Sequence, residues 1–235
     1  MNLKNKTAIV TGASQGIGKQ IALKLAKQGT NLALISRTES NLKEVAKQAS
    51  KLGAKKVQAY PCDIRNTEKL TQTIKSIAKD FKQINILINC AGIWQKMMPI
   101  EKVKPVIIDD VIQTNLTSLI HATNLILPHL KTQKDAAIIN VSSKSGVTAQ
   151  AGQSVYTASK WGVRGFTETL KADLKGTHIR VAGIYQSGTN TQMFHKTGET
   201  PPLEKFTNPA DLADTIVYIL SRPPKIWIHE IRVEY

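Results

Sequence analysis

The chain has 235 residues, of which 41% are hydrophobic, and it carries 32 basic against 17 acidic side chains, a formal net charge of +15. This length suits a single α/β domain, and no run of 18 or more apolar residues is present that could span a membrane. Lysines are spread along every expected helix, without a basic block or interleaved aromatic residues. A generally basic surface is therefore favoured over a specific nucleic-acid site.

The first residues and the cysteines indicate the compartment. Residues 1–6 lack an apolar signal core, and Cys62 and Cys90 are too few for a disulfide framework. We therefore expect a reduced, cytoplasmic protein. The five histidines pair with no carboxylate or cysteine motif, so no metal site is expected.

Strand-like apolar runs alternate with helical patterns along the whole chain. This alternation predicts one doubly wound α/β domain over 1–235, with a seven-stranded, mostly parallel sheet flanked by helices. Long helices are expected near 107–130 and 153–175. The expected strands are 6–11, 31–36, 56–61, 84–89, 136–142, 178–184 and 226–232.

The first expected strand runs into a glycine-rich turn, Thr11-Gly12-Ala13-Ser14-Gln15-Gly16-Ile17-Gly18, and a helical pattern follows. Strand, glycine turn and helix in this order are typical of a dinucleotide-binding site. Gly12 permits the sharp turn, Gly16 lets the backbone approach a pyrophosphate, and Gly18 lets helix and strand pack closely. Glycines that serve only a tight turn are the alternative.

The second expected strand ends Leu34-Ile35-Ser36-Arg37-Thr38, without a carboxylate at 36–38. An NAD site usually places an acidic residue there to bind the ribose hydroxyls. Ser36 and Arg37 can instead donate hydrogen bonds to a 2′-phosphate. The sequence therefore predicts NADP(H) as the cofactor.

Tyr156 and Lys160 are four residues apart within the expected helix 153–175, so they share one helix face. A neighbouring ammonium stabilises a phenolate and is expected to lower the phenol pKa from its usual value of about 10. Ser143 stands thirteen positions before Tyr156. A Tyr and Lys pair on a solvated helix face is the alternative.

The segment 186–207 is polar and rich in turns, and Asn208-Pro209 after it is a typical helix start. A loop of this length beside a nucleotide-binding fold is typically a substrate lid. A surface connection without that role is the alternative.

With Asn89-Cys90-Ala91-Gly92 and Asn115, these motifs resemble the short-chain dehydrogenase/reductase family, in its NADP-preferring form, over essentially the whole chain. The resemblance implies a Rossmann-type fold, hydride transfer between a carbonyl and an alcohol, and a homodimer or homotetramer formed through the two long helices. It implies four catalytic roles: Tyr156 as acid/base, Ser143 as carbonyl-oxygen anchor, Lys160 as pKa tuner and ribose ligand, and Asn115 as water holder in a proton relay.

The resemblance also implies a set of cofactor contacts, with Asp63 expected at the adenine amino group or as a helix cap. Two departures stand out: Gln15 where NADP users often have a basic residue, and Gln186-Ser187 where the family has Pro-Gly beside the nicotinamide. The full expected set is Gly12, Ser14, Gln15, Gly16, Ile17, Gly18, Ser36, Arg37, Asp63, Ile64, Asn89, Ala91, Gly92, Tyr156, Lys160, Thr189 and Thr191.

The segment 186–207 has few large apolar residues, and residues 225–235 lack the glycine-rich ending of the family's ketoacyl-carrier-protein reductases. We therefore expect a small polar or short-chain substrate such as a 3-hydroxy acid, whose carboxylate Lys144 or Lys96 could attract. One alternative is a 3-oxoacyl-(acyl-carrier-protein) reductase-like enzyme. Another is a non-catalytic homologue that senses nucleotides or binds nucleic acid.

Overall fold

The computed structural model describes residues 1–223 and 225–234. Seven strands form one sheet in the order β3-β2-β1-β4-β5-β6-β7, and all six neighbouring pairs are parallel. The predicted doubly wound fold is therefore confirmed. The strands are β1 (Thr7–Thr11), β2 (Asn31–Ser36), β3 (Val57–Pro61), β4 (Ile86–Asn89), β5 (Ala136–Val141), β6 (Ile179–Gln186) and β7 (Glu230–Val233).

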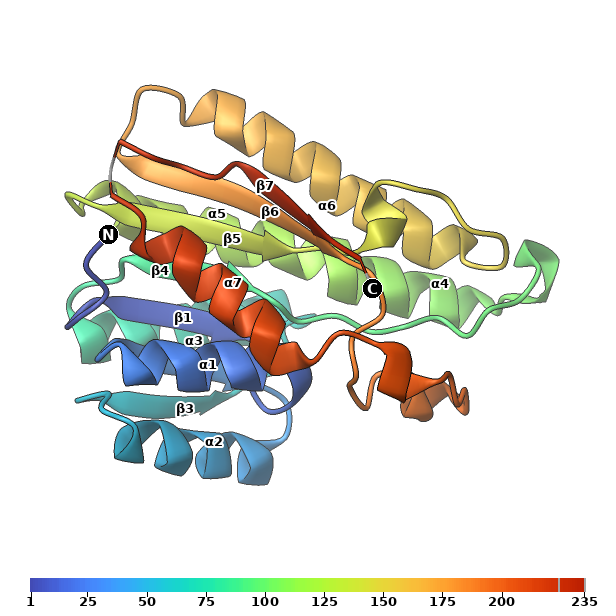
Figure 1. Cartoon of the computed structure of the whole chain (residues 1–235), viewed down its shortest axis with the longest axis horizontal. Helices are drawn as coiled ribbons and strands as arrows, with labels where there is room; N and C mark the ends of the chain where they lie inside the picture. Colours follow the sequence, from blue (N-terminus) through green and yellow to red (C-terminus); the bar gives the residue numbers. More distant parts are fainter. Residues whose placement is uncertain (224, 235) are drawn as a thin grey trace.

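Helices cover both faces of the sheet (Figure 1). One face carries α1 (Gly16–Lys27), α2 (Glu39–Lys51) and α7 (Pro209–Ser221). The other carries α3 (Thr67–Phe81), α5 (Ser118–Lys131) and α6 (Ser154–Asp173), with α4 (Pro105–Ile112) packed against α6. Among the described residues, none of the helices combines the length and apolar composition that a membrane span requires.

Successive residues of the central strands point to opposite faces, and both faces are core. Ile86 and Ile88 of β4 pack into the cluster beneath α1 and α7, whereas Leu87 packs into the cluster beneath α3 and α5. In β5, Ile139 packs into the first of these clusters and Ile138 into the second. A strand buried on both sides needs continuous apolar sequence, which explains why these strands were readable from the sequence.

Two predicted elements differ from the structure by more than two residues. The strand expected at 226–232 begins only at Glu230, because pairing with β6 extends only from Gly183↔Glu230 to Gln186↔Val233. The helix expected near 107–130 is divided into α4 and α5 by a π turn at Gln113–Thr117. Wide turns of this kind occur frequently at functional sites.

The switch point of the sheet lies between β1 and β4. The chain leaves β1 for β2 and β3 and then crosses to β4 on the other side of β1. The hydroxyl of Thr11, the last residue of β1, accepts hydrogen bonds from the N–H groups of Cys90 (3.0 Å) and Ala91 (3.2 Å) after β4. Ligands of open α/β sheets bind at the carboxyl ends of strands at such a point.

Candidate active site

A cavity of about 310 Å³ opens at this switch point, and we call it the dinucleotide cavity. The glycine turn after β1, the end of β2 and the loops after β3 and β4 line it. Most of the expected cofactor residues lie around it: Gly12, Ser14, Gln15, Gly16, Ile17, Gly18, Ser36, Arg37, Asp63, Ile64, Ala91, Gly92 and Thr191.

Asn89 lies elsewhere. It is 2% exposed, and its side-chain amide donates to the Thr123 hydroxyl (3.0 Å) and to the Asn140 side-chain oxygen (2.9 Å). It lines neither this cavity nor the larger one beside Tyr156 that is described below. Its polar side chain connects β4 to β5 and α5 inside the core.

The glycine turn leaves space that side chains would fill. Gly12 has φ +69°, and a Cβ atom there would lie 2.8 Å from the Cα of Ala91. A Cβ atom on Gly18 would lie 2.4 Å from the carbonyl oxygen of Gly12. Helix α1 begins at Gly16, so its first N–H groups and positive dipole end face the cavity. This cradle fits the pyrophosphate of a dinucleotide.

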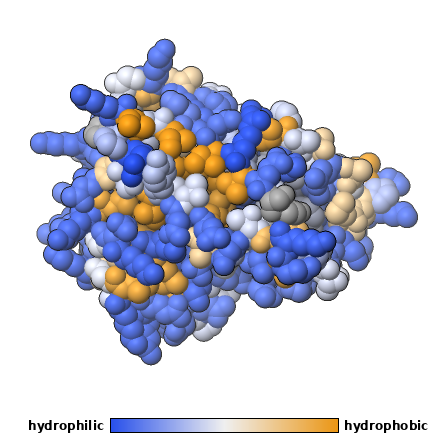
Figure 2. Space-filling view, viewed as in Figure 1, coloured by the Kyte–Doolittle hydropathy of each residue, from blue (hydrophilic) through white to orange (hydrophobic). Residues whose placement is uncertain are grey.

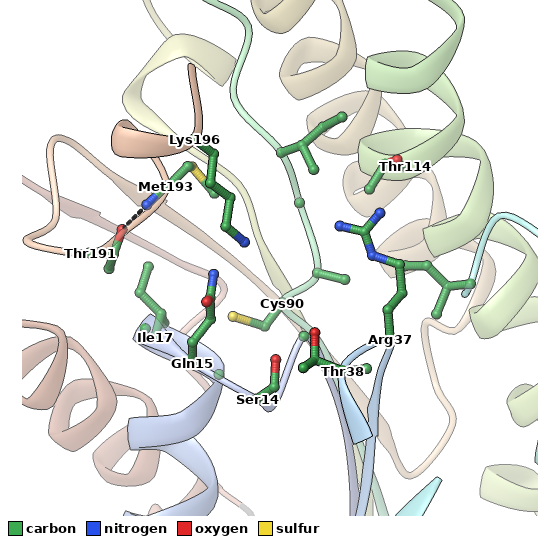
Figure 3. A pocket seen from close by; sticks show the side chains of 18 of the residues that line it. Ser14, Gln15, Ile17, Arg37, Thr38, Cys90, Thr114, Thr191, Met193 and Lys196 are labelled. Atoms are coloured by element: carbon green, nitrogen blue, oxygen red, sulfur yellow. Dashed lines mark hydrogen bonds between the residues drawn. The ribbon is translucent and has the colours of Figure 1, made fainter. Parts of the chain in front are cut away.

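Two basic side chains reach into the dinucleotide cavity from different parts of the chain (Figure 3). Arg37 follows β2, is exposed, and forms no ion pair within residues 1–223 and 225–234. Lys196 comes from the segment 186–207. Sequence reasoning missed Lys196, because one lysine in a lysine-rich chain carries no signal until folding brings it opposite Arg37.

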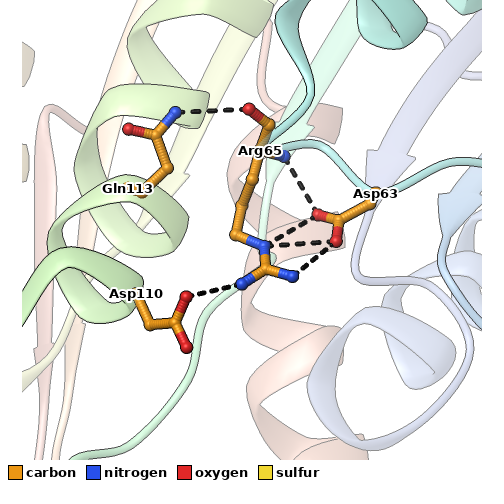
Figure 4. Close-up of polar contacts among 4 residues, drawn as sticks. All are labelled: Asp63, Arg65, Asp110 and Gln113. Carbon is orange, nitrogen blue, oxygen red and sulfur yellow. Dashed lines mark hydrogen bonds and ion pairs between the residues drawn. The ribbon is translucent and has the colours of Figure 1, made fainter. Parts of the chain in front are cut away.

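Asp63 lines the same cavity, but its carboxylate is held by Arg65 (Figure 4). The guanidinium donates to Asp63 at 2.7, 3.1 and 3.2 Å and also contacts Asp110 of α4 at 2.6 Å. The hydrogen bonds from Arg65 hold the pKa of Asp63 below its usual value. Asp63 thus ties the loop after β3 to α4, and its contact to adenine stays a prediction.

A second cavity of about 770 Å³, here called the catalytic chamber, contains Ser143, Tyr156, Lys160 and Thr189. The two cavities share wall residues in the first turn of α1, in the loop after β4 and in the segment 186–207, namely Ile17, Cys90, Gly92, Trp94, Thr191 and Met193. A dinucleotide in the first cavity can therefore present one end to the second.

Tyr156 and Lys160 are both buried in the chamber wall, one turn apart on α6. The Lys160 ammonium lies 5.6 Å from the centre of the Tyr156 ring and 3.5 Å from the carbonyl oxygen of Val141. Burial raises the pKa of Tyr156 to about 12, against the lowering influence of a hydrogen bond with Ser143. Burial also lowers the pKa of Lys160 to about 8.

The predicted lowering of the phenol pKa is therefore wrong. The prediction considered the neighbouring charge, whereas removal from water disfavours the charged form of both groups and dominates here.

Asn115, in the π turn, fixes the segment that follows β4. Its side-chain oxygen accepts from the Ile93 N–H (2.8 Å), and its amide donates to the Ile93 carbonyl (3.0 Å) and the Ser159 hydroxyl (3.1 Å). Gly92 makes this approach possible, since a Cβ atom there would lie 3.3 Å from that oxygen and 3.6 Å from the Lys160 nitrogen. The role of Asn115 as water holder stays a prediction.

Gln186 and Ser187, which stand where the family pattern has Pro-Gly, line the chamber. Their side-chain oxygens are buried and have no hydrogen-bond partner among the described residues. This wall of the chamber is consequently more polar than the family pattern predicts.

Another part of the chamber wall is aromatic and was not predicted. Trp94 packs edge-on against Tyr156 (ring centres 4.6 Å apart) and Phe194 (5.2 Å), and Phe194 packs against Phe206 (5.5 Å). The Trp94 N–H donates to the carboxylate of Glu199. The segment 186–207 is thereby attached to the segment after β4, at the indole that packs against Tyr156.

Comparison with known proteins places this geometry in a family. The model of the short chain dehydrogenase family matches residues 6–202. An uncharacterized oxidoreductase of Staphylococcus saprophyticus is 32% identical over 234 residues, which are 99% of this chain and 98% of that protein. The 3-oxoacyl-[acyl-carrier-protein] reductase of Thermotoga maritima is 30% identical over 229 residues, 94% of this chain and 92% of that protein.

A solved structure is also similar to this chain. A metagenomic short-chain oxidoreductase in complex with NADP superimposes with a TM-score of 0.87 at 26% identity, covering 100% of this chain and 99% of the other. The order of the motifs, the parallel sheet and these relatives lead to one conclusion: the chain belongs to the short-chain dehydrogenase/reductase family of oxidoreductases.

Proposed function

We propose that this protein is an NADPH-dependent reductase that converts a small or short-chain carbonyl compound into the alcohol. The observation that carries the proposal is the meeting of Ser143 and Tyr156 in a chamber that shares its wall with the dinucleotide cavity. When bound, the reduced nicotinamide supplies a hydride to the carbonyl carbon. The protein must then supply a proton and a dipole to the carbonyl oxygen.

The protonation state of Tyr156 supports the reducing direction. A pKa of about 12 keeps the phenol protonated at neutral pH, so it can donate its proton to the oxygen that gains negative charge. The Ser143 oxygen accepts from the N–H of Ser145 (3.2 Å), and its hydroxyl group hydrogen-bonds with Tyr156, so both hydroxyl groups lie together where the substrate oxygen must bind. The charged form of Lys160 stabilises negative charge beside them.

The segment 186–207 is proposed as the substrate lid. Its ends are held together where the N–H of Asn190 donates to the carbonyl of Thr207 (2.9 Å). Residues between these ends line both cavities, including Met193 in each and Phe194 in the chamber. A loop whose ends are held together over the reacting groups suits exclusion of water during hydride transfer.

The preference for NADP(H) rests on Arg37, with Lys196 opposite it, and on the NADP-bound metagenomic relative. In Arg37→Asp, a carboxylate faces the 2′-phosphate, and loss of a charge-assisted hydrogen bond costs about 1.5–3 kcal/mol. The affinity for NADPH should fall about tenfold to a hundredfold, while that for NADH changes little or rises. Fluorescence titration of both cofactors into both proteins measures the change; an unaltered preference would exclude Arg37 as its determinant.

The direct test of the proposed function is oxidation of NADPH across a panel of ketones, aldehydes and 3-oxoacyl thioesters. Turnover of short carbonyl compounds supports the proposal.

The Thermotoga relative favours a second candidate, a 3-oxoacyl-(acyl-carrier-protein) reductase-like activity. That candidate predicts specificity constants that climb with acyl length. Tight NADPH binding without turnover of any carbonyl compound would instead favour a nucleotide-sensing protein.

A further inference from the structure

Four charged residues line the catalytic chamber within the described part of the chain: Lys144, Lys160, Glu199 and Glu234. Lys144 is paired with Glu234, with 3.0 Å between the nitrogen and the carboxylate oxygen. Lys160 is buried against the ring of Tyr156 and belongs to the catalytic set. Lys96, which the sequence suggested as a carboxylate partner, does not line the chamber. Of the two lysines that the sequence suggested, Lys144 is thus paired with a carboxylate and Lys96 lies outside the chamber.

Glu199 is the remaining charge, and three donors fix its carboxylate. It accepts hydrogen bonds from the indole N–H of Trp94, the N–H of Met97 (3.2 Å) and the hydroxyl of Thr197 (3.0 Å). The same indole packs against the ring of Tyr156 at 4.6 Å between ring centres. One indole therefore separates the carboxylate of Glu199 from the tyrosine beside which the substrate carbonyl must lie.

We propose that Glu199 makes the enzyme select neutral carbonyl substrates, such as ketones and the esters or thioesters of keto acids, and reject free keto acids. This inference rests on the proposed carbonyl reductase function. A substrate carboxylate would lose hydration and meet a fixed like charge, and repulsion is strong in a partly buried site. The aromatic wall of Trp94, Phe194 and Phe206, with Met97 and Met193 beside it, instead offers apolar contact to a neutral group.

Methyl acetoacetate and acetoacetate test the inference, because they share the reacting ketone and differ in charge. We expect kcat/KM for the ester to exceed that for the acid by about tenfold or more. In Glu199→Gln the amide oxygen can still accept from the indole N–H of Trp94, whereas the N–H of Met97 loses its acceptor. The charge is gone, so the ester-to-acid ratio should fall about tenfold. NADPH affinity, measured by fluorescence, reports that the variant is folded.

Two further variants sharpen the comparison. Glu234→Gln releases Lys144 from its partner and should also lower the ester-to-acid ratio, without altering the segment 186–207. Glu204→Gln removes the same charge from an exposed position of that segment outside both cavities, so it should leave the ratio unchanged. A wild-type enzyme that prefers the acid, or a ratio that Glu199→Gln leaves unaltered, would overturn the inference.

Calorimetric titration of ester and acid into the NADP⁺-loaded protein separates this inference from the proposed function. Tighter binding of the ester, without NADPH oxidation by any carbonyl compound, would contradict the reductase activity and leave the selection for neutral ligands intact. NADPH oxidation together with tighter binding of the acid would support the reductase activity and contradict the selection for neutral ligands.

Discussion

Lys160 is a charged side chain held in an environment that disfavours its charge. It is 5% exposed, and burial lowers its pKa from 10.5 to about 8. Between these two values the unfolded chain binds more protons than the folded one, so the contribution of Lys160 to stability improves as pH rises through this window. Below it, at neutral pH, the cofactor-free fold carries the full cost of burying the ammonium. A functional group retained at the expense of stability is a common feature of active sites.

Lys160→Met should therefore stabilise the cofactor-free protein at pH 7 while weakening cofactor binding and turnover. The gain should be about 3 kcal/mol, because each pKa unit corresponds to about 1.4 kcal/mol. Urea unfolding measures it, and the difference from wild type should shrink as pH rises above about 8. Lys175→Met, just beyond the same helix and exposed, should change stability by less than about 0.5 kcal/mol. Equal stabilities of wild type and Lys160→Met at pH 7 would contradict the electrostatic argument.

Residues that act within one helix turn or one loop could be predicted from spacing, whereas contacts between distant segments could not. Tyr156 and Lys160 share a helix face whatever surrounds them. Trp94 and Glu199 are 105 positions apart and meet only because the segment 186–207 folds back over the loop after β4. The wrong prediction for the phenol pKa has the same origin, since burial is a property of the assembled fold.

At the scale of elements, two glycines in helices illustrate opposite constraints. A Cβ atom on Gly18 of α1 would lie 2.4 Å from the carbonyl oxygen of Gly12, whereas one on Gly165 of α6 would meet no atom within 4 Å. Gly18→Ala should force the turn apart, destabilise the protein by about 1–3 kcal/mol as overpacking does, and weaken NADPH binding. Gly165→Ala should stabilise it by about 0.5–1 kcal/mol, because alanine is the better helix former.

Thermal or urea unfolding and NADPH titration of both variants check this pair. If Gly18→Ala binds NADPH as wild type does, the turn does not need the close contact with Gly12 that the structure shows.

Most helices and strands could be predicted from the sequence, because a doubly wound sheet buries each central strand on both faces. Elements at the sheet edge and at the junctions between helices were harder to predict. β7 pairs with one neighbour only, and the side chain of Trp227 before it donates to the carbonyl of Val181 (2.8 Å) from a segment without strand pairing. The π turn between α4 and α5 depends on Asn115 finding Ile93, a contact that helical periodicity does not encode.

At the scale of the whole molecule, the helices beside the catalytic chamber expose apolar side chains. Val106 and Ile107 of α4, Ile120 of α5 and Trp161 of α6 are exposed, Trp161 to 46%. On the face with α1, α2 and α7, hydrophilic side chains predominate around several apolar patches (Figure 2). Apolar surface of this kind favours the expected homo-oligomer, formed through the helices in 105–131 and 154–173.

Trp161→Glu places a charge in that surface and should shift the protein toward monomer, as measured by light scattering after size-exclusion chromatography. Tyr218→Glu, at an exposed position of α7, is the matched control and should leave the assembly unchanged. An identical mass for wild type and Trp161→Glu at low concentration would show that the subunits associate elsewhere, or not at all.

The proposed function depends on Tyr156, which contacts Ser143, Lys160 and Trp94, as the proton donor. The most direct measurement is NADPH oxidation with a neutral ketone by wild type and Tyr156→Phe, alongside the NADPH dissociation constant of each. Phenylalanine keeps the ring packing and removes the proton, so turnover should fall at least about a hundredfold, while the dissociation constant changes by no more than about threefold. A Tyr156→Phe protein that binds NADPH normally and retains most of its turnover would contradict the proposed mechanism.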